Sequence, residues 1–251
     1  MKILSYVAAA IAGIAAAALA FTFLPSARQA LAPYEKSQIE AVVQSYIEAH
    51  PEIVAKALDA AQAQRKAAEL REQRASLRAK ADAIFRDPSD PVLGNPAGDV
   101  TIVEFFDYRC PYCKRSMPDV MQTVNGDGHI RLVLKEFPIL GPNSVLATRA
   151  ALASIQQGKY APFHEAMLAS KSELNEGAIL ALAEANGIDT KRLTEDMKSP
   201  AIDALIKKNY RLADDLKIEG TPVFIIGDRL IPGAVDKSAL ERLVQEARKK
   251  G

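Results

Sequence analysis

The hydrophobic and polar positions along the chain form three successive patterns. An uncharged apolar run fills residues 3–24, directly after Met1 and Lys2. From residue 33 to about 86, apolar residues recur every three or four positions, which is typical of amphipathic helices. Beyond residue 88, short apolar runs alternate with helical periodicity. The patterns therefore predict a leader, a helical segment and one α/β domain.

Residues 1–32 are predicted to be a signal peptide or a membrane anchor. The apolar run is close to the roughly 20 residues that a helix needs to span a bilayer. Small-residue triplets that favour cleavage occur at residues 18–20 and 30–32, the second directly before Pro33. Both alternatives stay open. Either one places the rest of the chain in an oxidising compartment, so we expect a periplasmic or cell-envelope location.

Residues 33–88 are predicted to be a separate helical segment. Ser37 and Glu40 have the spacing of a capping box, and Pro51 suits the first position of a second helix. Farther along, Leu70, Leu77 and Ile84 are seven residues apart, which indicates either a helix-helix seam or a solvated spacer. A helix-helix seam would make residues 33–86 the site of homo-oligomer formation.

Residues 89–251 are predicted to form the α/β domain, after a Pro- and Gly-rich linker at residues 87–98. Strands are expected at 100–107 and 130–137, with a helix between them, so these two strands should pair in parallel. Residues 141–216 have helical periodicity throughout. Residues 221–231 indicate a hairpin that turns at Gly227-Asp228, and an amphipathic helix follows.

Composition narrows the function classes. The chain has 251 residues, is 49% hydrophobic and carries a net charge of only +1. A net charge this small gives no overall electrostatic attraction for nucleic acid, so we expect no nucleic-acid partner. Lys135 and Glu136, opposite charges in the second strand, are expected to be an ordinary edge pair, and His164 a packed or surface side chain.

The two cysteines, Cys110 and Cys113, are the only ones in the chain. As a disulfide they would close a loop of four residues, worth about 2 kcal/mol against about 4.7 for a hundred-residue loop, so a purely structural role is a weak explanation. Zinc would need further ligands, and the three histidines lack paired spacing. We therefore predict no zinc site and no cofactor. Binding of Cu(I) by the two thiolates remains an alternative.

A working dithiol is the interpretation that we favour. At a helix N-terminus the unsatisfied amides stabilise a thiolate, which lowers its pKa. Cys110 would attack a disulfide, and Cys113 would resolve the resulting mixed disulfide. Pro111 and Tyr112, which separate them, would tune the redox potential.

Three sequence blocks carry a resemblance to a known family: VEFFDYRCPYCKRSMP, LVLKEFPILGPNSVLATRAALA and IEGTPVFIIGDRLIPGAVD. Together they resemble the DsbA-like thiol-disulfide oxidoreductases of the thioredoxin superfamily. The helical segment around QIEAVVQSYIEAHPEIVAKALDAAQAQ is similar to the N-terminal arm of ScsC-type members, where comparable helices serve in oligomerisation.

The resemblance implies a thioredoxin-like α/β fold with a helical insertion at about 141–216. It also implies a cis bond between Thr221 and Pro222 that faces the dithiol and docks substrate, and a buried Glu104 that relays protons to the resolving thiol. Cysteine-containing envelope proteins and a membrane redox partner would be the partners. Threonine before that proline, with Pro-Tyr between the cysteines, resembles the isomerase and reductase branches more than the strong oxidases.

Overall fold

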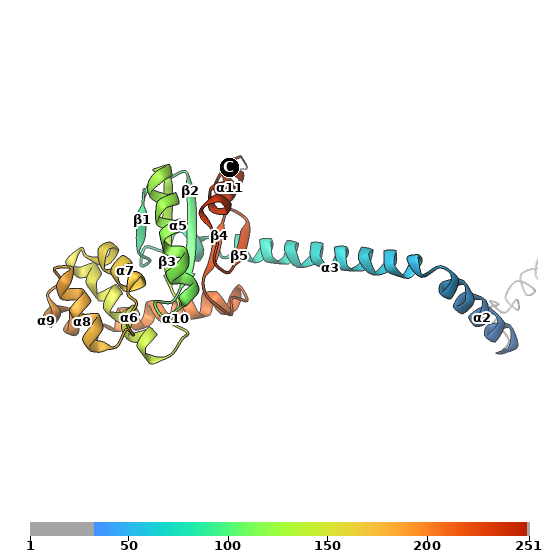
Figure 1. Ribbon diagram of the computed structural model, residues 1–251, viewed down its shortest axis with the longest axis horizontal. Coiled ribbons are helices and arrows are strands. Elements are labelled where there is room, and N and C mark those ends of the chain that lie inside the picture. The colour runs from blue at the N-terminus through green and yellow to red at the C-terminus, as the bar shows by residue number, and fades with distance from the viewer. Residues whose placement is uncertain (1–32, 250–251) are drawn as a thin grey trace, which may run out of the picture. The chain divides into compact units, whose positions relative to one another are not determined.

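A computed structural model describes residues 33–249 (Figure 1). The leader predicted at residues 1–32 lies outside this range. Within the described range, no helix carries an apolar stretch long enough to cross a membrane. The chain divides into two compact units, residues 1–65 and residues 66–251, which are described separately.

The described part of the first unit consists of two helices. Helix α2 spans Pro33–Ala49, and α3 spans Pro51–Ala79 and continues into the second unit. The predicted break at His50-Pro51 is confirmed, because proline fits the first turn of a helix but not its interior. The predicted capping box is wrong, because α2 already begins at Pro33 and Ser37 lies inside it.

The α2 and early α3 helices expose large apolar side chains. Their exposed fractions run from 40% for Val54 to 68% for Val42. The spacing of three and four residues places them along one stripe of each helix. The exposed set is Ile39, Val42, Val43, Tyr46, Ile47, Ile53, Val54 and Leu58.

The second unit is built on a five-stranded sheet (Figure 1). The strand order is β1-β3-β2-β4-β5; β2 and β3 pair in parallel, and every other pair is antiparallel. The hairpin predicted at Gly227-Asp228 is confirmed by the β4–β5 pairing. The strands are β1 Val92–Gly94, β2 Val100–Phe106, β3 Ile130–Glu136, β4 Val223–Ile226 and β5 Arg229–Pro232.

Helices cover both faces of this sheet, so β2 and β3 are buried on both sides. One face packs against α5 (Pro111–Asp127) and α11 (Lys237–Arg248), with Ile102 and Phe106 of β2 in that core. On the other face, Val103 and Phe105 pack with α4 (Ala81–Phe85) and the last turns of α10 (Pro200–Asp215). Double burial explains why these strands are nearly continuous apolar runs rather than alternating ones.

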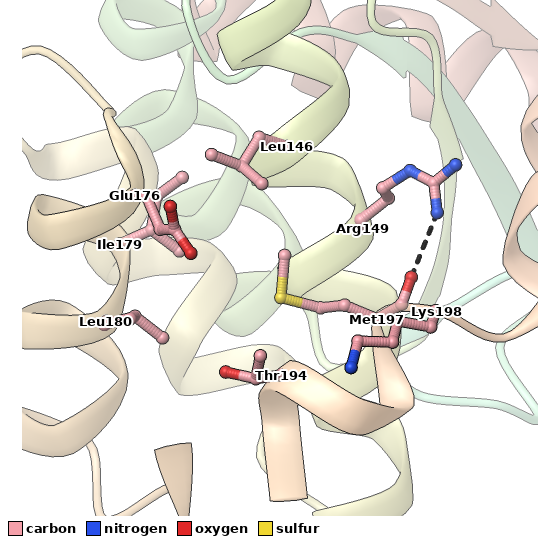
Figure 2. A pocket seen from close by; sticks show the side chains of 8 residues that line it. All are labelled: Leu146, Arg149, Glu176, Ile179, Leu180, Thr194, Met197 and Lys198. Atoms are coloured by element: carbon pink, nitrogen blue, oxygen red, sulfur yellow. Dashed lines mark hydrogen bonds between the residues drawn. The ribbon is translucent and has the colours of Figure 1, made fainter. Parts of the chain in front are cut away.

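The helical insertion is confirmed between β3 and β4. Figure 1 shows α6 to α9 gathered beside the sheet, with α10 leading back to it. A pocket of about 210 Å³ lies among α6, α8 and α9 (Figure 2). Its one arginine, Arg149, already donates to Met197 O and pairs with Asp203. The elements are α6 Pro142–Ser154, a 3-10 turn Ile155–Gln157, α7 Tyr160–Ala169, α8 Glu176–Ala185, α9 Thr190–Asp196 and α10.

Two sequence expectations near the start of this unit are wrong. The segment interpreted as a linker contains β1, which pairs with β3. Leu77 and Ile84, interpreted as part of an exposed seam, are buried in the core beside Phe105. The seven-residue spacing of Leu77 and Ile84 therefore reflects their packing onto the sheet within this unit.

Candidate active site

The two cysteines lie where β2 gives way to α5. Cys110 is the N-cap residue of α5, and Cys113 lies in its first turn. Both are free thiols; Cys110 is 3% exposed and Cys113 is fully buried. Pro111 occupies the first helical position, and the Tyr112 side chain is 53% exposed. The two cysteines therefore lie at a helix N-terminus, as predicted.

The loop before β4 faces this pair. The peptide bond between Thr221 and Pro222 is cis. The Cys110 thiol donates a hydrogen bond to the Thr221 carbonyl oxygen at 3.2 Å. Since β4 pairs with β2, the sheet itself fixes this loop beside the start of α5. The structure therefore brings Thr221 and Pro222 to the dithiol, 111 residues away in sequence.

The two thiols have opposite acidities. A hydrogen bond from the Cys113 thiol, supported by the amides of Cys113 and Tyr112, lowers the pKa of Cys110 to about 6 against the effect of burial. The same Cys110–Cys113 hydrogen bond, burial and the negative charge of Glu104 all raise the pKa of Cys113. At neutral pH the arrangement favours one thiolate on Cys110 beside a protonated Cys113.

Glu104 lies on β2, on the same sheet face as the cysteine helix. Its side chain is 4% exposed. Burial, and then the negative charge of Cys110, raise the pKa of this carboxyl to about 8. A buried carboxyl that titrates near neutrality is suited to proton transfer.

Asp107, which the sequence analysis did not single out, shapes the turn before the cysteines. Its carboxylate accepts hydrogen bonds from the Arg109 amide at 2.7 Å, the Leu140 amide at 2.9 Å and the Ser144 hydroxyl at 2.8 Å. Its carbonyl oxygen accepts from the Cys110 amide at 3.0 Å. An aspartate directly after a strand and two residues before an amide that it binds is a recognised turn signal.

Glu136 is the centre of a second buried group. Its carboxylate accepts hydrogen bonds from Tyr108 at 3.0 Å, Tyr160 at 2.8 Å and Thr148 at 2.8 Å. Tyr108 also contacts His164 Nδ1 at 2.9 Å. Burial raises the pKa of Glu136 to about 8, although the three hydroxyl hydrogen bonds lower it, and burial lowers the pKa of His164 to about 3.

The expected edge pair of Lys135 and Glu136 is wrong. β3 lies between β1 and β2, so it is not an edge strand, and its successive side chains point to opposite faces. Lys135 is buried and pairs with Asp90, while it also donates to Ala83 O at 2.5 Å. Both side chains are therefore internal: Lys135 pairs with Asp90, whereas Glu136 accepts hydrogen bonds from neutral hydroxyl groups.

Metal ligands are not clustered in the part of the chain that the structure describes. No group of three or more His, Cys, Asp or Glu side chains there is arranged to hold an ion. Within residues 33–249, the dithiol with Glu104 and the Thr221-Pro222 loop is the arrangement that combines a nucleophile, a buried acid and a facing wall.

Comparison with known proteins places this geometry in context. The family model described as thioredoxin matches residues 86–246, more than half of the chain. A solved thioredoxin-like oxidoreductase from Silicibacter pomeroyi is 49% identical, covers 67% of this chain and 97% of its own, and superposes with a TM-score of 0.66. A linker-deletion mutant of Proteus mirabilis ScsC is 25% identical, covers 90% of this chain and 100% of its own, with a TM-score of 0.68.

Curated proteins with similar sequences fall into two groups. Disulfide bond formation protein D of Bacillus subtilis is 27% identical over 183 residues, which are 66% of this chain and 81% of that protein. The first relatives found are bacterial Na(+)/H(+) antiporters, and the chain spans about a quarter of their length. The expected fold, thioredoxin-like with an N-terminal helical segment, is thus confirmed, and its similar structures are of the DsbA and ScsC type.

Proposed function

The chain belongs to the thioredoxin family, and we propose that it is an exported thiol-disulfide oxidoreductase that acts on cysteine-containing envelope proteins. The observation that carries the proposal is the opposite acidity of two free thiols that share a hydrogen bond. Names of similar proteins, an oxidoreductase and a disulfide bond formation protein, support it.

The reaction begins at Cys110. Its thiolate attacks one sulfur of a substrate disulfide, which forms a mixed disulfide and releases the other substrate sulfur as a thiolate. Cys113 then loses its proton and attacks the Cys110 sulfur. The substrate leaves as a dithiol, and the protein keeps the two-electron oxidised Cys110–Cys113 disulfide. If a substrate thiol attacks the mixed disulfide instead, the substrate disulfide is rearranged with no net oxidation.

Glu104 would accept the Cys113 proton. In the free enzyme, the charge of the Cys110 thiolate helps to raise the pKa of Glu104. Mixed-disulfide formation removes that charge, so the pKa of Glu104 falls and a carboxylate becomes available when Cys113 must ionise. The timing of the proton transfer would then follow from the chemistry of the first step.

The direction of exchange follows from the same acidities. A pKa of about 6 for Cys110 stabilises the reduced enzyme less than the values near 3.5 that accompany the strongest oxidants. We therefore infer a role in shuffling or reducing disulfides, with a membrane partner that resets the dithiol. An equilibrium titration against glutathione measures the potential, and a value near that of the strongest oxidants would contradict this direction.

The catalytic claim is tested with scrambled ribonuclease. Wild type should restore ribonuclease activity, and Cys110→Ser should not. Cys113→Ser should form mixed disulfides that accumulate, because attack proceeds without resolution. Equal ribonuclease recovery with wild type and Cys110→Ser would remove the proposal.

The helical segment of residues 33–86 is proposed to join copies of this chain. Its exposed apolar stripe is larger than isolated surface residues explain, and a second copy of the stripe is its natural complement. Val42→Glu should lower the mass measured by light scattering on the full chain. Ala41→Glu, on the opposite side of the same helix, serves as the control. An unchanged mass with Val42→Glu would count against the association.

Copper binding is the other function open to these sulfurs. Two soft thiolates select Cu(I), but the raised pKa of Cys113 opposes the second thiolate. We therefore rank exchange ahead of copper binding. Competition with a chromophoric Cu(I) chelator tests the alternative, and retention of copper against the chelator would reverse this ranking.

A further inference from the structure

Three basic residues stand beside the cysteine motif in the chain, and we call Arg109, Lys114 and Arg115 the cationic rim. Arg109 directly precedes Cys110. Lys114 lies one helical turn beyond it, where its amide donates to the Cys110 carbonyl oxygen. The Arg115 guanidinium lies 4.7 Å from the centre of the Tyr112 ring, inside the cysteine motif. All three residues therefore lie within about one helical turn of Cys110 along the chain.

The rim is held in place mainly by carbonyl and aromatic groups, which carry no formal negative charge. Arg109 donates to Leu140 O at 2.6 Å, and Lys114 donates to Ser170 O at 2.6 Å. The carboxylate that Arg109 reaches is Glu173, at 3.8 Å and itself 64% exposed. Burial, and then the positive charge of Arg109, lower the pKa of Lys114.

Asp107 and Glu104, which precede the cysteines, are buried and do not form part of the rim. Asp107 is fully buried, and its two oxygens are occupied by two amides and a hydroxyl. Glu104 is buried, and its raised pKa keeps much of it protonated at neutral pH. In a chain with a net charge of only +1, the mouth of the dithiol is thus a local concentration of positive charge.

We propose that the cationic rim selects protein substrates that carry acidic side chains next to the reactive cysteine. This inference rests on the proposed exchange activity of Cys110. A substrate cysteine that reaches Cys110 brings its flanking residues close to Arg109 and Arg115. The exposed Tyr112 ring keeps Arg115 over the motif, so that the guanidinium can donate hydrogen bonds to a carboxylate without leaving its place.

The effect should appear mainly in the rate of encounter. Complementary charges at a rim speed association and lose their effect as salt screens them. An exposed ion pair changes an equilibrium or rate by roughly 1.4- to 5-fold. Two flanking carboxylates should therefore give about a three- to tenfold advantage at low ionic strength.

Synthetic peptides test the inference. Each peptide carries one cysteine as a mixed disulfide with 2-mercaptoethanol, flanked by two Glu, two Gln or two Lys. Complete exchange with the reduced protein releases the peptide thiol and 2-mercaptoethanol and leaves the Cys110–Cys113 disulfide. The second-order rate constant should fall in the order Glu, Gln, Lys at low salt, and the three values should converge at high salt.

Two variants of the full chain complete the test. Arg115→Gln should reduce the ratio of the Glu-peptide rate to the Lys-peptide rate by roughly 1.4- to 5-fold. Lys191→Gln, which removes an exposed charge on α9, should leave that ratio unchanged. Equal rates for the three peptides, or an unchanged ratio in Arg115→Gln, would overturn the inference alone. Absence of exchange with every peptide would instead overturn the proposed function.

Discussion

Two buried acids, Glu104 and Glu136, lie on neighbouring strands and have the same raised pKa of about 8, but their surroundings differ. Glu136 is held by three hydroxyl donors, on Tyr108, Tyr160 and Thr148. For Glu104, burial and the Cys110 charge are what act on the carboxyl. Equal acidity therefore does not mean an equal role.

We propose that the difference separates a structural acid from a chemical one. Hydrogen bonds to both carboxylate oxygens of Glu136 fix its geometry and connect the turn before the cysteines to α6 and α7. The acidity of Glu104 instead changes with the charge of the thiol next to it. A carboxyl whose pKa responds to a reaction step can take part in that step, whereas a carboxyl bound by fixed donors stabilises the fold around it.

Replacement of Glu104 should have the largest effect. In Glu104→Gln, attack by Cys110 proceeds, but Cys113 loses its proton acceptor, so resolution of a preformed mixed disulfide should slow by about 100-fold. In wild type the resolution rate should rise with pH to a plateau below about pH 8, because the acceptor must be ionised and its pKa falls when the Cys110 charge is lost. Rapid-quench alkylation followed by mass spectrometry measures this step. An unchanged rate would make Glu104 a passive buried acid.

Replacement of Glu136 should act on stability. Glu136→Gln leaves at least one buried hydroxyl without its acceptor, so the free energy of unfolding should fall by about 2 kcal/mol. Urea denaturation at pH 7 measures it. Glu104→Gln is the matched comparison, because it makes the same change at a buried carboxyl with the same pKa of about 8 but without the hydroxyl hydrogen bonds that act on Glu136. Equal losses in the two variants would abolish the distinction between the acids.

Removal of one hydroxyl should have the smallest effect. Tyr108→Phe keeps the ring contacts with Phe106 and His164 but removes one donor to Glu136, so about 1 kcal/mol should be lost. The pKa of Cys110 should stay near 6, because the groups that lower it are Cys113, Thr221 and the Tyr112 amide, and Tyr108 is not among them. Urea denaturation measures the loss of stability, and thiolate absorbance in the same samples measures the pKa of Cys110. A changed Cys110 pKa in Tyr108→Phe would show that the Glu136 hydrogen-bond network affects the acidity of the nucleophile.

Much of the fold could be predicted from local signals. The break at Pro51, the parallel strand-helix-strand unit, the helical insertion and the hairpin at Gly227-Asp228 each depend on residues close together in sequence. β1 was missed because three residues are too short for a periodic pattern and lie in a Pro- and Gly-rich stretch. Leu77 and Ile84 were misinterpreted because helical spacing does not say which surface a stripe packs against.

The candidate site could be predicted only in part. The cysteine motif is local, and the resemblance supplied Thr221, Pro222 and Glu104. The Glu136 network could not be found in this way, because its members come from β3, the turn before α5, α6 and α7. Tertiary packing alone brings them together, and their burial turns ordinary polar residues into one connected group.

The titration of the Cys110 thiol tests the central claim most directly. Thiolate absorbance near 240 nm, recorded from pH 4 to 10 on the reduced protein, should show one thiolate with a pKa of about 6. Cys110→Ser should abolish this transition. Cys113→Ala should move it to higher pH, because the Cys113 thiol donates the hydrogen bond that lowers the Cys110 pKa most and alanine has no donor. Absence of a thiolate below pH 8 in wild type, or its persistence in Cys110→Ser, would contradict the account.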